Sequence, residues 1–253
     1  MRQGRGKIEG VAFEGMIARL SGEPILEVTL RRSGRARRLS LRVSGLDGRA
    51  TLTIPTWYPQ EEALVFLREK EDWLRQALGR LPSRCPIAPG SEVLLEGRRM
   101  KLREGRSRQF RIEDEVLFVP PDPTGTRTAP RLEAFLKASA RAAVLPAVTE
   151  YAAQIGRSAQ AVSLRDTRSR WGSCTADGRL MFSWRLIMAP PQVLRYVAAH
   201  EVAHLVHMDH SRAFWDCVDR LMPDYGPHRQ WLRNNGAQLH GYCFKPRSSG
   251  DNG

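Results

Sequence analysis

The sequence predicts an α+β protein in which a β-rich N-terminal subdomain with one long helix precedes a mixed α/β domain. Three observations favour this fold class. Short runs between residues 38 and 119 alternate apolar and polar side chains, as half-buried strands do. Residues 131–155 instead carry a long helical pattern, and the segment 119–130 between them is rich in Pro, Thr and Gly. We therefore expect the domain boundary in that segment.

These boundaries define three regions. Residues 1–125 form the N-terminal β-rich subdomain, and residues 126–245 form the mixed α/β domain with a helix that carries the candidate site. The tail 246–253 lacks apolar residues and is expected to be disordered.

Three hairpins are expected in the N-terminal subdomain. In the first, residues 37–43 and 50–55 alternate on either side of an Asp47-Gly48 turn. The second turns at Glu96-Gly97 and the third near Glu113-Asp114. One helix, from Pro59 to Leu81, interrupts them, with Leu64, Leu67, Leu74 and Leu78 near one face.

The second domain should begin with a helix from Arg131 to about Ile155, bent or capped at Pro146. A short strand follows at 161–166. A hairpin then joins 169–174 to a second strand, 180–188. Three helices complete the domain: one opened by Pro190 and Pro191, one with Ser211 as N-cap, and one stopped by Gly236.

The net charge of +13 and the pI near 10.4 raise the question of a polyanionic partner. Of the 40 basic residues 35 are arginines, and the excess is spread over both halves of the chain. The densest cluster runs from Arg31 to Arg42. A solvated strand face and turn is the simpler reading of this cluster, so nucleic acid is a weakly supported partner.

Cys85, Cys174, Cys217 and Cys243 form no CxxC pair, and we expect four free thiols. No stretch approaches the 18 uninterrupted apolar residues of a membrane span, and the charged, glycine-rich N-terminus lacks a signal-peptide core. These observations predict a cytoplasmic protein with no membrane partner.

The segment HEVAHLVHMDHS, residues 200–211, holds four of the six histidines. On a helix, His200 and His204 lie about 40° apart around the axis and roughly 6 Å apart along it, so both rings can reach one ion. Glu201 projects about 100° away, where it can contact a water on that ion. This H-E-x-x-H arrangement supplies two zinc ligands and a general base.

A catalytic zinc needs a third protein ligand and an open fourth position. His210 follows His204 by six residues, the spacing of the third histidine in the pattern H-E-x-x-H-x-x-G-x-x-H. His207 replaces the glycine of that pattern and is a rival ligand. A ligand arriving from a turn has better geometry than a third one on the same helix, which favours His210. Asp209 is a weaker candidate for orienting a ligand.

Three segments resemble the YgjP-like metallopeptidase family, whose relatives include SprT-like and minigluzincin proteins: TRSRWGSC, FSWRLIMAPPQVLRYVAAHEVAHLVHMDHSRAFW and LMPDYGPHRQWL. The resemblance is dense over residues 160–236 and implies a zincin-like metallopeptidase domain. It also implies that His210 is the third ligand. Ser183 stands where the family commonly has asparagine, which puts any role of that side chain in doubt.

The expected function is that of a zinc-dependent metallopeptidase acting on a peptide or protein substrate, with Glu201 as general base and His200, His204 and His210 as metal ligands. The strand around Trp171–Cys174 could pair with an extended substrate, and Arg170 is a weaker candidate for stabilising the oxyanion. Alternatives are a zinc hydrolase of a non-peptide amide and a DNA-associated protein with the SprT-like role of cleaving DNA-bound proteins. A purely structural zinc site is disfavoured, because such a site needs no base.

Overall fold

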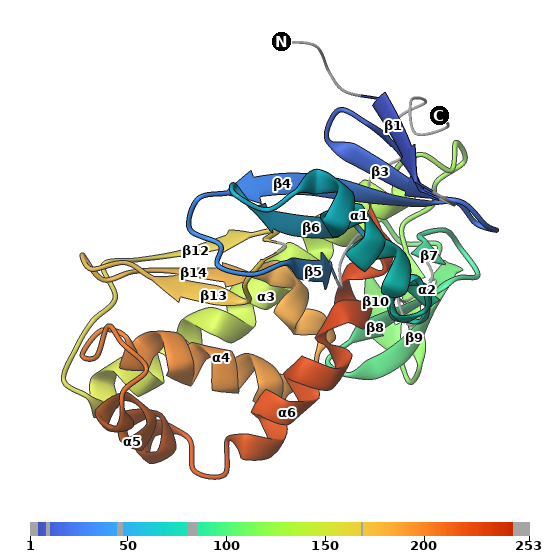
Figure 1. Cartoon of the computed structure of the whole chain (residues 1–253). Coiled ribbons are helices and arrows are strands. Elements are labelled where there is room, and N and C mark those ends of the chain that lie inside the picture. Colours follow the sequence, from blue (N-terminus) through green and yellow to red (C-terminus); the bar gives the residue numbers. More distant parts are fainter. Residues whose placement is uncertain (1–4, 9–10, 45–47, 80–84, 168, 245–253) are drawn as a thin grey trace. The chain divides into compact units, whose positions relative to one another are not determined.

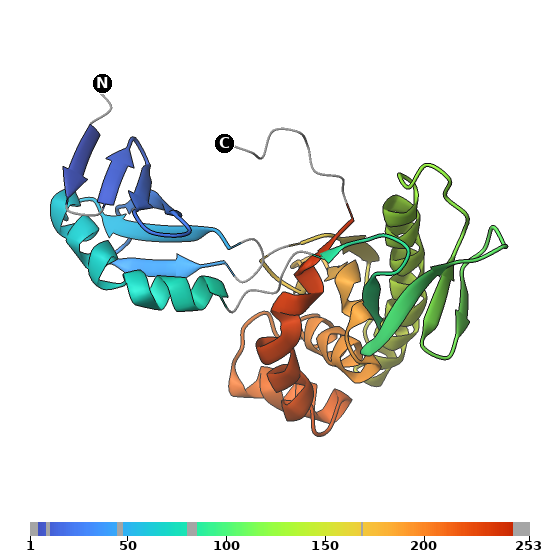
Figure 2. The ribbon, with the colours of Figure 1, turned by 90° about the vertical axis from the view of Figure 1, so that its right-hand side faces the viewer.

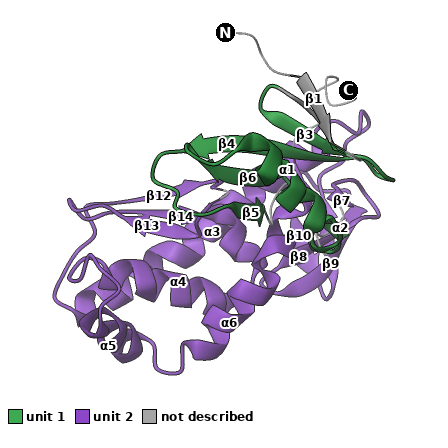
Figure 3. Ribbon diagram, in the orientation of Figure 1, with its two compact units in different colours: residues 1–82 green, residues 83–253 purple. Residues whose placement is uncertain are grey.

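The structure is a computed structural model that describes residues 5–8, 11–44, 48–79, 85–167 and 169–244. The expected tail at 246–253 and Asp47 of the first expected turn lie outside these residues. The chain divides into two compact units, Met1–Pro82 and Ser83–Gly253 (Figure 3).

The border of the compact units lies well before the Pro-rich segment in which the sequence places a domain boundary. That segment is not a free linker. Within it, the buried carboxylate of Asp122 accepts hydrogen bonds from the backbone N–H of Arg127 (2.6 Å) and Thr128 (2.7 Å). These bonds hold the segment against the start of the following helix. The division at residue 125 into functional domains stays a prediction.

The first unit holds a six-stranded sheet (Figure 1) in the order β1-β2-β3-β4-β6-β5. Neighbouring strands are antiparallel except β4 and β6, which are parallel and pair Val28 with Ala50 through Ser33 with Pro55. The antiparallel pairing of β5 with β6 confirms the first predicted hairpin. The strands are β1 (Arg5–Ile8), β2 (Val11–Glu14), β3 (Ile17–Leu20), β4 (Leu26–Ser33), β5 (Ser40–Val43) and β6 (Ala50–Pro55).

Two helices, α1 (Gln60–Glu69) and α2 (Glu71–Gly79), replace the single long helix that the sequence predicts. The interruption is one residue, Lys70, and both helices keep the predicted buried face. Leu64, Leu67 and Leu74 are fully buried in one core with the sheet residues Val28, Leu52 and Ile54. Figure 2 shows the two helices lying along one side of this sheet.

The second unit contains a four-stranded sheet in the order β10-β11-β9-β8. Its strands are β8 (Glu92–Leu95), β9 (Arg98–Glu104), β10 (Arg111–Glu113) and β11 (Val116–Val119). The pairs β8–β9 and β10–β11 are antiparallel, which confirms the second and third predicted hairpins.

The turn between β8 and β9 is fastened to a distant segment of the same unit. Both turn residues have positive φ, 52° at Glu96 and 78° at Gly97. Their backbone N–H groups donate to the carbonyls of Ile187 (2.8 Å) and Met188 (3.1 Å). A Cβ at Gly97 would lie 2.9 Å from Cγ of Pro190, so only glycine allows this approach.

A three-stranded sheet, in the order β12-β14-β13, places β13 at an edge. Its strands are β12 (Ala161–Arg165), β13 (Gly172–Cys174) and β14 (Arg179–Ser183). The hairpin β13–β14 is confirmed, but its second strand ends at Ser183 instead of Met188. Trp184–Met188 forms a 3-10 helix, η1. Its buried Arg185 turns away to bond Asp166 (2.7 Å) and the Leu239 carbonyl (2.7 Å), which a continuing strand would prevent.

The helices of the second unit are α3 (Thr128–Gln154), α4 (Pro191–Ala203), α5 (Arg212–Leu221) and α6 (Gly226–Asn235). The helix α3 contains Pro146, as predicted, and packs along both η1 and α4. A second 3-10 helix, η2 (Gly236–His240), follows α6 without a break, and β15 (Tyr242–Cys243) pairs in parallel with β7 (Cys85–Pro86). Among the described residues, no helix combines the length and apolarity that crossing a membrane requires. The six α-helices and several sheets in the described part of the chain agree with the α+β class.

Candidate metal centre

The helix α4 carries the first part of the histidine-rich segment. Pro191 begins it, and its apolar side chains, including Val193 and Val197, are buried in the core of the second unit. The helix ends at Ala203 because the chain tightens into a turn there, so His204, which the sequence places on the helix, is its C-cap residue. The N–H groups of Val206 and His207 both bond the Ala203 carbonyl (3.1 and 3.0 Å).

The structure brings His200, His204 and His210 together. One ring nitrogen from each lies within 4.8 Å of the other two. The Nε2 atoms of His200 and His210 are 3.2 Å apart. Two nitrogens that each lie about 2.0–2.1 Å from a tetrahedral zinc are separated by about 3.3–3.4 Å. The observed spacing therefore fits a shared ion.

The ring of His204 is oriented by the turn that ends α4. Its Nδ1 lies 2.8 Å from the carbonyl oxygen of His207. Since a carbonyl only accepts hydrogen bonds, Nδ1 must carry the proton and Nε2 is left with a free lone pair. A hydrogen bond of this kind on the second ring nitrogen is typical of metal-ligating histidines.

Burial keeps His200 in the uncharged form that a metal requires. Burial, reinforced by the positive charges of His204, His210 and Arg229, lowers the pKa of His200 to about 3. Among the described residues, its Nδ1 is buried without a hydrogen-bond partner. A neutral imidazole with Nε2 directed at His210 is the ligand form of the side chain.

Phe214 forms an apolar support beneath all three histidines. It is fully buried, and its ring centroid lies 4.9 Å from that of His200, 4.4 Å from His204 and 4.8 Å from His210. It belongs to α5, whose N-cap Ser211 accepts a hydrogen bond from the Phe214 N–H (3.5 Å), as predicted. The only sequence signal for this role of Phe214 is its position four residues after His210.

Glu201 is 5% exposed and lies against the backbone of β13. A Cβ at Gly172 would be 2.6 Å from Cγ of Glu201, so the glycine leaves the space that the carboxylate occupies. Burial raises the pKa of Glu201 to about 8, and the positive charge of Arg170 opposes the rise. With a pKa of about 8 the side chain is mostly a neutral carboxyl at neutral pH. A cation held by the histidines would lower this pKa and favour the carboxylate, the form that accepts a proton.

Cys174 also lies on β13, and its thiol is not poised to react. Burial, and then the charges of Glu201 and Asp177, raise the pKa of Cys174 to about 11. The thiol is protonated near neutral pH, which makes it a poor nucleophile and a poor metal ligand. None of the four cysteines forms a disulfide, in agreement with the expected thiols.

The remaining sequence candidates have other positions. His207 contributes its carbonyl, and its ring is not part of the histidine cluster. Asp209 accepts a hydrogen bond from the Ser211 N–H (3.1 Å) and so shapes the turn before α5. Trp215, which follows Phe214 on α5, is half-buried. Its ring centroid lies 5.9 Å from that of His210 and stacks on Tyr225 at 5.7 Å.

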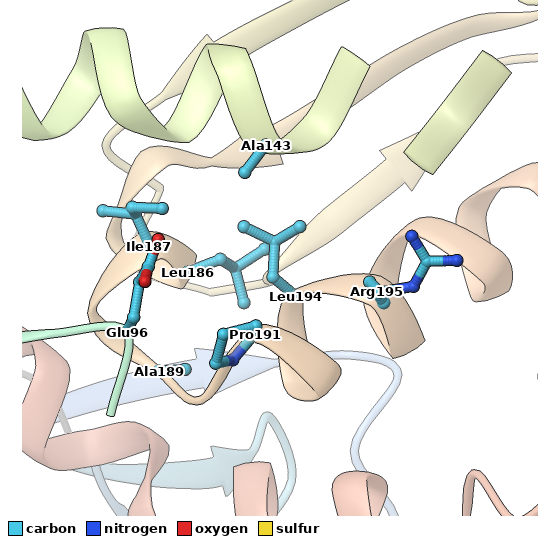
Figure 4. A pocket seen from close by; sticks show the side chains of 8 residues that line it. All are labelled: Glu96, Ala143, Leu186, Ile187, Ala189, Pro191, Leu194 and Arg195. Carbon is cyan, nitrogen blue, oxygen red and sulfur yellow. The ribbon is translucent and has the colours of Figure 1, made fainter. Parts of the chain in front are cut away.

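A small cavity of about 140 Å³ lies elsewhere in the second unit, between α3, η1 and α4. Its lining is mostly apolar, with Leu186, Leu194 and Ala143 facing inward, and Glu96 and Arg195 stand on opposite sides of it (Figure 4). None of the three clustered histidines lines it. The cavity is separate from the histidine cluster.

Comparison with known families matches residues 37–235 to the YgjP-like family, described as a metallopeptidase domain. The chain belongs to the YgjP-like family. This confirms the resemblance drawn from the sequence. Membership indicates a metal-dependent peptidase, and the histidine cluster is a group that could hold the metal. No curated protein and no solved structure matches the chain.

Proposed function

We propose that the chain is a zinc-dependent metallopeptidase in which His200, His204 and His210 hold the metal and Glu201 is the general base. The observation that carries this proposal is the convergence of three imidazoles beside a buried carboxylate. Three neutral nitrogen ligands suit zinc, and three protein ligands leave one position of a tetrahedral ion open, as in catalytic sites.

When bound, zinc supplies Lewis acidity that polarises the scissile carbonyl and makes water acidic enough to be deprotonated near neutral pH. Glu201 takes a proton from the attacking water on a carboxylate oxygen and later delivers it to the leaving amine nitrogen. Gly172 has no Cβ and so leaves the space in which this carboxylate lies. Burial of Glu201 excludes bulk water from its surroundings, which favours transfer of the proton to the leaving group over its loss.

The edge strand β13 supports a peptide as the substrate. It has a pairing partner on one side only, β14, among the described strands, so its other side offers backbone groups to an extended chain. Because Gly172 of this strand touches Glu201, a peptide paired there would pass close to the base. Arg170 precedes the strand and is exposed, so its guanidinium is available to a developing negative charge.

The proposal is tested first by the zinc content per chain, measured by elemental analysis in the parent protein and in two variants. We expect about one zinc in the parent protein. We expect its loss in His210→Ala and its retention in His207→Ala, the matched control, because His207 acts through its carbonyl. A parent protein that takes up no zinc at neutral pH would refute the metal site.

The role of Glu201 is tested separately with Glu201→Gln, which keeps the shape of the side chain and removes its basicity. Cleavage of an unfolded protein should fall by about 10²–10⁴-fold while zinc content is unchanged. Hydrolysis of small non-peptide amides, with no cleavage of any unfolded protein by the zinc-loaded parent, would instead support the alternative amide hydrolase.

A further inference from the structure

The first unit presents a cationic surface that the proposed peptidase chemistry does not use. Its arginines come from the segment 31–42, which contains six arginines and no acidic residue. All six are exposed. Among the described residues, no carboxylate forms an ion pair with Arg31, Arg35, Arg37, Arg38 or Arg42.

Strand register places two of these arginines on one face of the sheet. Arg31 of β4 pairs with Thr53 of β6, and Arg42 of β5 pairs with Thr51. Thr51 and Thr53 are two residues apart, so they share a face, and it is the one opposite to buried Leu52. The guanidinium of Arg31 donates to Oγ1 of Thr53 (3.3 Å). This face is therefore polar and positive, while the opposite one packs against α1 and α2.

The other arginines lie just beyond the strand ends at one end of this sheet. Because β4 and β6 are parallel, the segments that follow them leave at the same end: 34–39, with Arg35, Arg37 and Arg38, and 56–59. Arg32 links the two segments, since its Nη1 atom donates to the carbonyls of Thr56 (3.2 Å) and Tyr58 (3.1 Å).

An aromatic residue stands exposed at this same end of the sheet. Trp57 is 69% exposed, and it is the most exposed large apolar side chain in the part of the chain that the structure describes. Its ring centroid lies 5.4 Å from that of Tyr58. Exposure of a large apolar ring to water does not stabilise the fold. An exposed indole does offer a flat surface on which a base can stack.

We infer that this surface, formed by Arg31, Arg35, Arg37, Arg38, Arg42 and Trp57, binds single-stranded nucleic acid. A guanidinium group can bind two oxygens of one phosphate at the same time. The hydroxyls of Thr51 and Thr53, which lie beside Arg42 and Arg31, add neutral hydrogen bonds. The indole distinguishes this surface from one suited to an acidic polypeptide, for which charge alone would suffice. Stacking on Trp57 requires unpaired bases, which favours single strands over duplexes.

The experiment measures binding of the full chain to fluorescently labelled oligo-uridylate and oligo-thymidylate of about 20 nucleotides, by anisotropy. The triple variant Arg35→Gln, Arg37→Gln, Arg38→Gln should weaken binding by at least about tenfold. It should also lower the slope of log affinity against log salt by about 2. Its matched control carries the same change at three exposed arginines of the second unit, Arg103, Arg106 and Arg108. The control should change affinity by less than about threefold.

A second pair of variants tests the stacking platform. Trp57→Ala should weaken binding by about tenfold, whereas Trp73→Ala, which removes another exposed indole on α2, should have little effect. Equal losses in both arginine triples would show that the net charge alone attracts the strand, and would overturn the proposal. The proposal would also be overturned if poly-glutamate displaced the oligonucleotide completely and Trp57→Ala bound the oligonucleotide as tightly as the parent protein. This result would identify an acidic polypeptide as the ligand. Equal melting temperatures of all variants would establish that each is folded.

Discussion

The two units of the chain differ in what they bury. Among the described residues, six polar or charged side chains are at most 9% exposed, and all belong to the second unit: Asp122, Thr128, Ser183, Arg185, Glu201 and His204. The core of the first unit consists of apolar side chains. The first unit is thus held by the hydrophobic effect and keeps its charges at the surface, whereas the second uses buried polar groups to fix backbone segments and the candidate site.

The largest expected effect is a loss of activity when Gly172, which makes room for the buried carboxylate of Glu201, is replaced. Gly172→Ala should displace Glu201 and lower peptide cleavage by at least about 100-fold, with zinc content preserved. Gly226→Ala is the control, because a Cβ there meets no atom within 4 Å. Normal cleavage by Gly172→Ala would show that Glu201 can act from another position.

The apolar core of the first unit should respond to loss of volume. Leu52→Ala removes a fully buried side chain and should lower the free energy of unfolding of this unit by about 2–5 kcal/mol. Hydrogen exchange, read peptide by peptide, should show faster exchange in β4, β5 and β6. Zinc content should be unchanged. Equal acceleration throughout residues 83–244 would mean that the units unfold as one.

Arg185 should be the most sensitive polar group of the second unit outside the site. Arg185→Met keeps much of the volume but removes the guanidinium that donates to the Leu239 carbonyl and to Asp166. We expect a loss of about 2–4 kcal/mol in the free energy of unfolding, measured with denaturant. Arg195→Met breaks a part-exposed ion pair with Glu150 and should cost at most about 1 kcal/mol. Similar losses in both variants would contradict the contrast between buried and surface charges.

The smallest predicted effect is a dependence on pH. Burial alone would raise the pKa of Asp122, but the hydrogen bonds from Arg127, Thr124 and Thr128 outweigh it and hold the pKa far below its ordinary value. A carboxyl with a depressed folded-state pKa stabilises the fold fully above its unfolded pKa of about 3.9 and loses this contribution as the pH falls further. Asp122→Asn should therefore flatten the fall in melting temperature between about pH 4 and pH 2. Asp216→Asn, at an exposed site, should leave the fall unchanged.

The sequence predicted the elements whose patterns are local. The three hairpins and α3 follow from alternation and helical spacing, and the histidine cluster falls within eleven residues. It did not predict where α4 ends or that η1 replaces a strand, because these depend on tertiary bonds such as those of Arg185. Strands β1 to β4 were not assigned, although Leu26, Val28 and Leu30 alternate in β4.

The candidate site was predictable in its side chains but not in its backbone. The spacing to His204 and the better geometry of a ligand on a turn favoured His210 over His207, and the structure places the ring of His210 in the cluster. The carbonyl of His207 and the missing Cβ of Gly172 have no sequence signature, because any residue has a carbonyl and glycines are common. Their roles become visible only when the turn and the edge strand are placed beside α4.

The fastened turn at Glu96-Gly97 has a consequence for protein engineering. Hairpin tips are the usual positions for inserting affinity tags or reporter domains, because their backbone commonly faces solvent. Here two N–H groups of the tip hold Ile187 and Met188, just ahead of the helix that carries the histidines. An insertion at this tip would release that helix from its anchor. At the tip Asp114-Glu115 both residues are exposed, and in the described part of the chain their carbonyls accept hydrogen bonds only from Arg98 and Lys101 of the neighbouring strand β9. This tip is the better position for a cargo that must leave α4 undisturbed.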